Sequence, residues 1–317
     1  MARQLVARLG IFLLSLAAAS FAIFVITQAL PGDVAAVILG HGATPEQLAA
    51  KRAELGTDRP FGVQYLEWVG GLLTGDLGRS WFSSLPISTL IAPRLEVTGS
   101  LVVGGLALAV LIALPLGALA ALKRRRLPGL LTSAAAQVGM AIPAFWAGIL
   151  LVFVFGVLLR WLPPNGYVPF GRDPGRWASH LVLPVVTLGV IQAAVLVRYV
   201  RSAFLEVLSE DYYRTARAVG WTKGRALVRH GIRNAALSLV TVLGLQLASV
   251  IVGAIVIERV FVLPGLGSAL LDAVATSDLV VVRGITMLLV FAVLVINAVV
   301  DLSYVLIDPR LRTREES

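Results

Sequence analysis

Residues 204–234 read FLEVLSEDYYRTARAVGWTKGRALVRHGIRN and separate two long apolar segments of the chain. Charged residues recur every few positions, so this stretch is too polar to lie in the hydrocarbon core of a bilayer. The apolar segments beside it, near 180–200 and 235–257, are each long enough to cross a membrane. This alternation predicts a membrane protein in which a polar connection joins two transmembrane helices.

The rest of the chain repeats this alternation. Of its 317 residues, 58% are hydrophobic and only 14% are charged, a composition typical of a polytopic membrane protein. A helix rises about 1.5 Å per residue, so about 20 apolar residues cross a hydrocarbon core of roughly 30 Å. The sequence therefore predicts an all-α integral membrane protein with six transmembrane helices. They lie near residues 9–30, 97–122, 130–159, 180–200, 235–257 and 284–307.

The distribution of lysine and arginine predicts the orientation, because basic residues are retained on the cytoplasmic side. One side carries 17 of the 27 basic residues, in segments 3–8, 123–126, 198–233 and 310–314. The other side carries 10, over a longer stretch and beside acidic residues. Both termini are therefore predicted to be cytoplasmic. Because the bases are spread along membrane flanks, the net charge of +9 does not indicate a nucleic-acid surface.

The N-terminal segment 1–30 has two interpretations. Basic residues precede an apolar run with small residues at 17–19, as in a secretory signal peptide. The run continues to Leu30, however, which is long enough to span a bilayer, and five further spans follow. An uncleaved first transmembrane helix is the simpler prediction.

Residues 31–96 form the longest segment predicted outside the cytoplasm. Thr44, Pro45 and Glu46 have the pattern of a helix start, with Thr44 as the N-cap and Pro45 at the first helical position. Apolar residues at helical spacing predict short amphipathic helices against the membrane surface or the neighbouring spans. They are Leu48, Leu55, Val63, Leu66, Val69 and Leu73. We expect a small helical cap here and no separate enzyme domain.

No catalytic motif is visible in the sequence. The chain has no cysteine, so disulfides and thiolate chemistry are excluded, and its three histidines are far apart. It has no phosphate-binding GxxxxGK[ST] loop, GxSxG motif or HExxH motif. We therefore expect no enzyme activity, metal or cofactor in this chain. A secondary transporter or channel remains an alternative, although such proteins need ion-coupling charges in the membrane and these spans show almost none.

Within residues 204–234, the sequence predicts two short helices around a turn. Ser209 is the expected N-cap of a helix of about ten residues, and Gly220 is the expected left-handed residue at its end. The other expected features are acids at Glu210 and Asp211 in the first turn, one face formed by Tyr212, Ala216 and Val219, and a second helix starting at Thr222. Two interpretations stay open. The hairpin is either simply solvated or a docking module for a cytoplasmic protein, since exposed aromatic residues are costly.

These segments resemble a known family, the permease subunits of dipeptide and oligopeptide ATP-binding-cassette (ABC) importers, which also includes nickel and glutathione permeases. EDYYRTARAVGW (210–221) and RHGIRNA (229–235) are similar to the cytoplasmic loop that couples to the ATPases in that family. Segments along nearly the whole chain also resemble it, and the large loop after the first span is similar to one of its two permease types. They are LPGDVA, LGTDRPFGVQYLEWVGGLLTGDLGRS, IPAFWAGILL, LPPNGY, LPVVTLG, ERVFVLPGLGSALLDAV and DPRLR.

The resemblance implies a type I ABC importer permease fold in a bacterial inner (plasma) membrane. An external substrate-binding protein would deliver substrate, and a second homologous permease would complete the pathway. Two cytoplasmic ATPase subunits would hold ATP and Mg²⁺, so the missing phosphate loop is expected. Short peptides are the first expectation for the substrate, with nickel chelates and glutathione as alternatives. The implied parts are a first transmembrane helix (1–30), an outer cap (31–96), a five-helix core (97–308) with the coupling loop 204–234, and a cytoplasmic tail (309–317).

Three sets of site residues follow from the resemblance and from residue polarity. Coupling to the ATPase is assigned to Tyr213, Arg214, Thr215, Ala216, Ala218, Gly220, Trp221, Arg233 and Asn234. The translocation pathway is assigned to polar or helix-perturbing residues of the spans, with helix packing as the alternative and a kink expected at Pro143. These are Gln137, Met140, Pro143, Phe145, Trp146, Gln246 and Asn297. Contact with the binding protein, or alternatively a purely structural turn, is assigned to Glu258, Phe261, Pro264, Gly265, Leu266 and Gly267.

Overall fold

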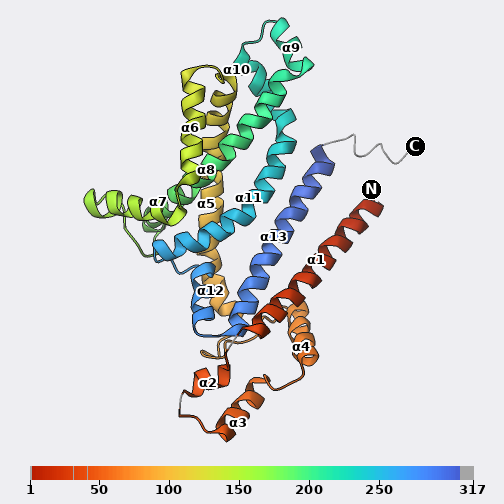
Figure 1. The fold of residues 1–317 in the computed structure, drawn as a ribbon, viewed down its shortest axis with the longest axis vertical. Helices are drawn as coiled ribbons and strands as arrows, with labels where there is room; N and C mark the ends of the chain where they lie inside the picture. The colour runs from red at the N-terminus through yellow and green to blue at the C-terminus, as the bar shows by residue number, and fades with distance from the viewer. Residues whose placement is uncertain (1, 31, 41, 308–317) are drawn as a thin grey trace. The chain divides into compact units, whose positions relative to one another are not determined.

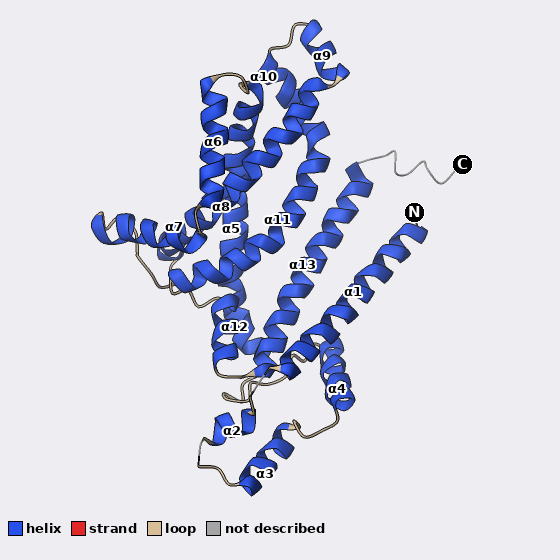
Figure 2. Cartoon of the chain, in the orientation of Figure 1, coloured by secondary structure: helices blue, strands red, loops and turns tan. Residues whose placement is uncertain are grey.

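The computed structural model describes residues 2–30, 32–40 and 42–307, and within them it leaves out the side chains of 2–5, 230, 233, 234, 236–238 and 303–307. The described residues form helices, turns and loops without any strand, as Figures 1 and 2 show, and this confirms the predicted all-α class. The chain separates into two compact units, residues 1–97 with 264–295 and residues 98–263 with 296–317. The predicted tail, 309–317, and the DPRLR segment lie outside the described residues.

Five described helices are long and apolar enough to cross a membrane, and a bent pair passes the same test when its two helices are taken together. The five belong to α1 (Ala2–Ala29), α5 (Ile87–Leu122), α8 (Pro174–Ser209), α11 (Ile232–Val260) and α13 (Leu279–Ile307). The pair consists of α6 (Leu127–Ala141) and α7 (Ala144–Leu151), which continues into the π-helical segment η1 (Val152–Leu158). Five of the six predicted spans are therefore confirmed. The third stays a prediction, because a pair of helices bent in this way is either one broken span or a re-entrant loop, and the cytoplasmic location of both termini stays a prediction as well.

The third span is not the single helix predicted over 130–159. Its two halves are bent by 99° at a short break after Ala141. Pro143 has no backbone N–H and disfavours helical backbone at the residue before it, and Ile142 accordingly adopts an extended conformation with ψ of 122°. The kink predicted at Pro143 is confirmed, and it is sharp enough to break the helix.

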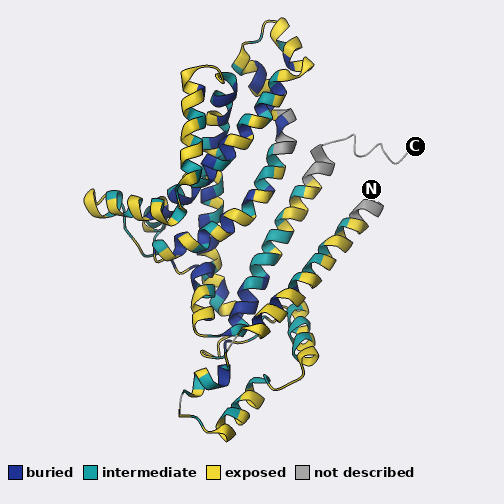
Figure 3. Ribbon diagram, viewed as in Figure 1, coloured by how far each residue is buried: buried dark blue, intermediate teal, exposed yellow. Residues whose placement is uncertain are grey.

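The second unit is built around α8. This helix packs against α6 and α11, and 61% of its most apolar part is buried, against 17–33% in the other four spans (Figure 3). Helix α5 also approaches α8 closely, because a β-carbon at Gly105 or Gly117 would lie within 3.0 Å of Leu188 or Val200. Small residues at helix interfaces allow such close packing in membranes. Helix α8 therefore lies in the interior of this unit.

The first unit contains α1, the short helices α2 (Val34–Leu39), α3 (Pro45–Leu55), α4 (Phe61–Thr74) and α12 (Leu266–Ala275), and the first parts of α5 and α13. Phe24 of α1 is fully buried, and the ring centroids of Phe61 and Tyr65 in α4 lie 5.0 and 5.4 Å from its own. Arg283 of α13 lies 4.2 Å from the same ring centroid and donates a hydrogen bond to Thr27 Oγ1 at 2.7 Å. One aromatic ring thus joins α1, α4 and α13.

The predicted helix start at Thr44 is confirmed. The Thr44 hydroxyl accepts a hydrogen bond from Gln47 N, and the Gln47 side chain accepts one from Thr44 N, which makes a capping box. Pro45 is the first residue of α3, as predicted, and Glu46 lies in its first turn. The local sequence is therefore sufficient to place this helix.

The predicted apolar stripe of α4 does not face α1. Leu66 and Leu73 are 69% and 84% exposed, whereas Phe61, Tyr65 and Trp68 supply the rings that contact Phe24. The helix itself was correctly predicted. The aromatic residues lie on the adjacent side of α4, and their partner ring is about 40 residues earlier in the chain. Of the two predicted partners of the stripe, the neighbouring span α1 is therefore excluded, and the membrane surface stays a prediction.

Candidate functional site

The connection 204–234 contains the end of α8, α9 (Asp211–Ala218), α10 (Lys223–Ala226), the π-helical segment η2 (Leu227–Gly231) and the start of α11. In Figure 1, α9 and α10 lie at the end of α8, with α9 projecting from the helices that carry it. The two predicted short helices around a turn are confirmed. The first has eight residues, slightly fewer than predicted.

Ser209 does not cap α9, contrary to the prediction. It is the last residue of α8, and its hydroxyl donates to Glu206 O at 2.6 Å. Helix α8 continues this far because Phe204 and Val207, one turn apart, are both buried in the core. Glu210 occupies the N-cap position of α9 with extended backbone and makes no side-chain cap. The start of α9 is therefore set by where α8 stops.

A Schellman motif built on Gly220 ends α9. Gly220 has a φ of +101°, which favours glycine. Trp221 N donates to Ala216 O at 3.2 Å and Gly220 N donates to Arg217 O at 3.1 Å, the two backbone bonds that define this motif. The Arg217 guanidinium also donates to Trp221 O. The predicted role of Gly220 as the left-handed terminator is confirmed.

Tyr213 anchors α9 to the second unit. Its side chain is only 6% exposed and belongs to the same apolar cluster as Phe204 and Ala226. Its hydroxyl donates to Lys223 O, the first residue of α10, at 3.1 Å. Burial raises the pKa of the Tyr213 phenol above its ordinary value, so the hydroxyl stays a neutral donor at physiological pH. One side chain thus ties α9 across the turn to α10.

The outward face of α9 differs from the predicted one. Tyr212 and Val219 were expected to share a face with Ala216, but they are 37% and 75% exposed, whereas Ala216 packs against the core cluster. The buried face is instead formed by Tyr213 and Ala216, which are three residues apart. The anchoring tyrosine is therefore the second of the pair, and the first lies at the surface.

The predicted coupling residues separate into two groups. Arg214, Thr215, Ala218 and Gly220 are exposed, and Thr215 Oγ1 donates back to Asp211 O at 3.0 Å. Tyr213, Ala216 and Trp221 hold the helix in place, with the Arg225 guanidinium 5.5 Å from the centroid of Trp221. The side chains of Arg233 and Asn234 lie outside the described residues. The four exposed residues and their exposed neighbours Tyr212 and Val219 form a small surface, which we call the α9 face: Tyr212, Arg214, Thr215, Ala218, Val219 and Gly220.

The predicted pathway residues have different surroundings. Gln137 and Met140 lie on α6 and Phe145 and Trp146 on α7, so the 99° bend at Pro143 separates the two pairs. Gln137, Phe145 and Trp146 are exposed, whereas Met140 is partly buried. The structure does not gather these residues into one described cavity, and their pathway role stays a prediction.

The two polar pathway residues outside the third span also differ from each other. Gln246 of α11 is buried and Asn297 of α13 is exposed. A third amide was not predicted. Gln192 of α8 is 7% exposed, and its Oε1 has no hydrogen-bond partner among the described residues. Gln246 was selected because it is an amide within an apolar span. The same criterion would also have selected Gln192 as a pathway residue.

The residues predicted to contact a binding protein are mostly buried. Glu258 is fully buried and accepts a hydrogen bond from Thr98 Oγ1 at 2.6 Å, and Phe261 is 1% exposed. Leu266 is 1% exposed, and Gly265 and Gly267 are buried as well. Pro264 is the exposed member of the set. The contact stays a prediction, and the burial favours a structural role for the other five residues.

Comparison with known proteins finds two family matches along the chain. Residues 113–313 match the family described as binding-protein-dependent transport system inner membrane component, and residues 1–102 match the N-terminal region of such membrane components. These two matches cover most of the chain. Both the helical core with the α9 face and the segment that carries α1 to α4 are therefore features of one family.

Individual relatives are similar over almost their whole length. A protein of Brucella abortus (strain 2308) named as a peptide transport system permease is 42% identical over 91% of this chain and 92% of its own. A peptide ABC transporter permease protein of Sinorhizobium fredii is 38% identical over 92% and 93%. The dipeptide transport system permease protein DppB of Escherichia coli (strain K12) is 36% identical over 97% and 98%.

The fold and the relatives lead to the same assignment. Several apolar helices long enough to span a bilayer make this a multi-pass protein of the bacterial inner membrane. The family consists of transport permeases and not of catalytic enzymes. This chain belongs to the family of inner membrane components of binding-protein-dependent transport systems, the permeases of ABC importers.

Proposed function

We propose that this chain is one of two homologous permease subunits of an ATP-driven importer of short peptides. Its relatives named as peptide and dipeptide permeases support this substrate class. An external binding protein would deliver the peptide. Two cytoplasmic ATPase subunits would bind ATP and Mg²⁺ and hydrolyse ATP. Nickel chelates and glutathione are the alternative substrates within this class of importers.

The observation that carries the proposal is the attachment of α9 to the segments before and after it. Helix α9 directly follows α8, and it is joined to α10 both by the Schellman turn and by the bond from Tyr213 to Lys223. Segments α10 and η2 lead directly into α11. A partner that pulls on α9 therefore displaces the ends of two membrane spans together.

The exposed chemistry of the α9 face suits a protein partner. It combines an aromatic ring at Tyr212 and an apolar side chain at Val219 with the small residues Ala218 and Gly220. Arg214 adds a charge whose contact with Asp211, at 3.3 Å, is solvent-exposed and weak. Small residues allow close approach, and exposed apolar groups of this size favour burial in an interface. We assign this face to a groove of the ATPase subunit.

The test places a charge on this face without disturbing its mounting. Ala218→Asp alters an exposed residue, so α9 should keep its fold, but the carboxylate would lose its hydration on docking. In the co-expressed complex reconstituted in liposomes, we expect peptide-stimulated ATP hydrolysis and peptide uptake to fall at least about tenfold, since 1.4 kcal/mol suffices for that. Leu127→Glu, an exposed residue in the first turn of α6, is the matched control for an added charge. Wild-type uptake by Ala218→Asp would contradict the assignment.

The substrate is tested in the same liposomes. Dipeptides, glutathione and a nickel chelate are each supplied with the cognate binding protein, and ATP hydrolysis and uptake are measured. We expect dipeptides to give the largest stimulation. Stimulation by the nickel chelate alone would keep the importer class and overturn the peptide assignment.

A further inference from the structure

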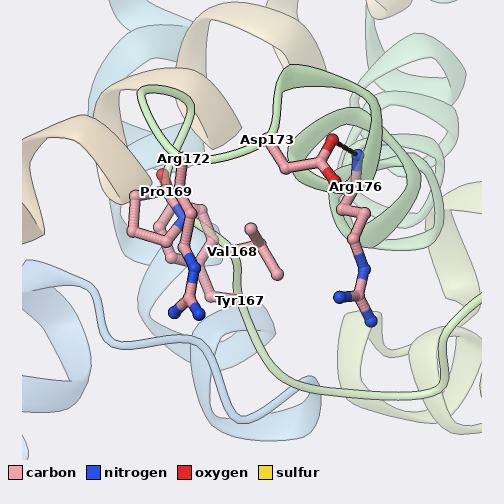
Figure 4. Close-up of a pocket in the computed structure, with 6 residues that line it drawn as sticks. All are labelled: Tyr167, Val168, Pro169, Arg172, Asp173 and Arg176. Atoms are coloured by element: carbon pink, nitrogen blue, oxygen red, sulfur yellow. Dashed lines mark hydrogen bonds between the residues drawn. The ribbon is translucent and has the colours of Figure 1, made fainter.

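A cavity of about 270 Å³ lies in the second unit, in the loop that leads from the third span into α8. Figure 4 shows its lining, which combines apolar side chains with two arginines. The residues are Tyr167, Val168, Pro169, Arg172, Asp173 and Arg176. None of them was assigned a role from the sequence. The volume is close to the lower end of the range for small-ligand sites.

The charge of the cavity is dominated by the two arginines. Arg172 and Arg176 are four residues apart and exposed, and neither guanidinium forms an ion pair among the residues that the structure describes. The acid between them is already engaged, because Asp173 Oδ1 accepts a hydrogen bond from Arg176 N at 3.0 Å and caps α8. The cavity therefore offers two guanidinium groups and a net positive charge to a ligand.

The apolar lining completes a site with two kinds of surface. In Figure 4 the side chains of Arg172 and Arg176 project from opposite sides, with Val168 between them and Tyr167 beside Arg172. Guanidinium groups bind carboxylates through paired, charge-assisted hydrogen bonds, and the Tyr167 ring and Pro169 offer apolar contact. A small ligand with one oxyanion end and a short apolar body fits both.

The cavity is tied to the loop after α11. Gly166, next to the lining residue Tyr167, donates its N–H to Phe261 O at 3.0 Å. Both loops are predicted to lie on the outer side of the membrane, where a binding protein would release its substrate. This position favours a transported solute as the ligand over a cytoplasmic metabolite.

We propose that this cavity receives the C-terminal carboxylate of a short peptide as it enters the permease, with Arg172 and Arg176 as its ligands. The inference rests on the proposed peptide-import function. It adds a specificity element in the permease itself. This element recognises the free carboxylate common to all unmodified peptides and does not discriminate between their side chains.

The test uses the absence of cysteine in this chain. The variant Val168→Cys, whose new thiol is the single cysteine of this chain, is modified with N-ethylmaleimide in the assembled importer. The importer is held in phosphatidylcholine nanodiscs without binding protein, and the rate of modification is read from the mass of this chain. We expect alanylalanine to slow modification and its C-terminal amide to leave the rate unchanged. Arg172→Gln or Arg176→Gln should raise the concentration of alanylalanine that halves the modification rate about tenfold, in line with the loss of one charged hydrogen bond. Arg160→Gln, an arginine of the same loop outside the cavity, should leave it unchanged.

Two results would overturn the proposal. One is equal protection by the peptide and its amide, or none by either. The other is protection without peptide that arises when phosphatidylglycerol is added to the nanodiscs, because the site would then hold a lipid headgroup. Peptide uptake by the cysteine variant is measured in parallel. Normal uptake without protection rejects only the cavity assignment, whereas a wild-type complex that imports no peptide rejects the proposed function.

Discussion

Helices α3 and α9 are both short and polar, yet different interactions hold them. Helix α3 has a capping box at Thr44 and a left-handed glycine, Gly56, at its end, and none of its residues is buried. Helix α9 ends on a similar glycine, Gly220, but has no side-chain cap at its start and buries Tyr213 in the core. The first is specified by its own residues and the second by the unit that it joins.

This difference bears on what each helix can transmit. When a partner pulls on a helix that is held only by local hydrogen bonds, that helix is displaced without its neighbours, because it has no buried contact with them. A helix with a buried anchor carries its neighbours along, since packed interiors transmit displacement and deform little. The α9 helix therefore suits a coupling role. Three tests compare the two helices: one of the Tyr213 anchor, one of the terminating glycines and one of the link between Asp33 and Arg52.

The largest expected effect is that of Tyr213→Ala. Truncating a buried aromatic side chain costs about 3–5 kcal/mol, and here it also removes the bond to Lys223 O. We expect hydrogen–deuterium exchange of residues 211–226 to rise strongly and peptide-stimulated ATP hydrolysis to be lost. Tyr213→Phe, which keeps the ring, should cost only about 1 kcal/mol.

The neighbouring tyrosine supplies the control. Tyr212→Ala removes a ring of the same size from the exposed face, so we expect the exchange of 211–226 to remain near that of the wild type. If Tyr212→Ala loosened α9 as much as Tyr213→Ala, the assignment of Tyr213 as the anchor would be wrong.

A smaller effect is expected when the terminating glycines are compared. Gly220 and Gly56 have φ of +101° and +70°, and neither would bring a β-carbon into a steric clash. Because the left-handed well for other residues is centred near +57°, Gly56→Ala should cost about 1 kcal/mol and Gly220→Ala about 2 kcal/mol. Exchange of the last turn of each helix measures both. Equal increases in the two helices would contradict this ranking.

The comparison also shows how far the sequence predicts this structure. Five spans, the N-cap at Thr44 and the turn at Gly220 were predicted correctly, because each depends on residues close together in the chain. The predicted cap at Ser209 was wrong because serine is common at helix starts, and only the burial of Phe204 and Val207 extends α8 through it.

Faces of helices were harder to predict than their ends. The amphipathic patterns of α4 and α9 each allow more than one apolar side, and the partner decides which side is buried: Phe24 for α4, and the cluster around Phe204 for α9. The cavity beside Arg172 was missed for a related reason. Its arginines fit the pattern of residues that flank a membrane span, and only the fold shows that the Asp173 carboxylate accepts a hydrogen bond from the backbone N–H of Arg176 and caps α8.

The smallest expected effect concerns the link that joins α2 to α3. Asp33 caps α2 through Oδ1, and its Oδ2 accepts hydrogen bonds from Arg52 Nε and Nη2 at 3.0 and 2.6 Å. The bonds from Arg52 lower the pKa of the Asp33 carboxyl below its ordinary value of 3.8. The ionised carboxylate is favoured in the fold. The link is therefore complete at any pH above the pKa of a free aspartate, about 3.9, and it is lost as the pH falls through the lower pKa that Asp33 has in the fold.

A spin label on a single cysteine at Ala49 of α3 measures this link. Its mobility should stay constant from pH 7 to pH 5 and rise only below about pH 4. Asp33→Asn keeps the cap on α2 but removes the charge, so the label should be mobile at every pH. Peptide uptake should be unchanged in this variant, because α3 is held locally and buries no anchor. A transition near pH 6 would instead require a titrating group other than Asp33, and loss of uptake in Asp33→Asn would mean that the outer helix transmits motion as α9 is proposed to do.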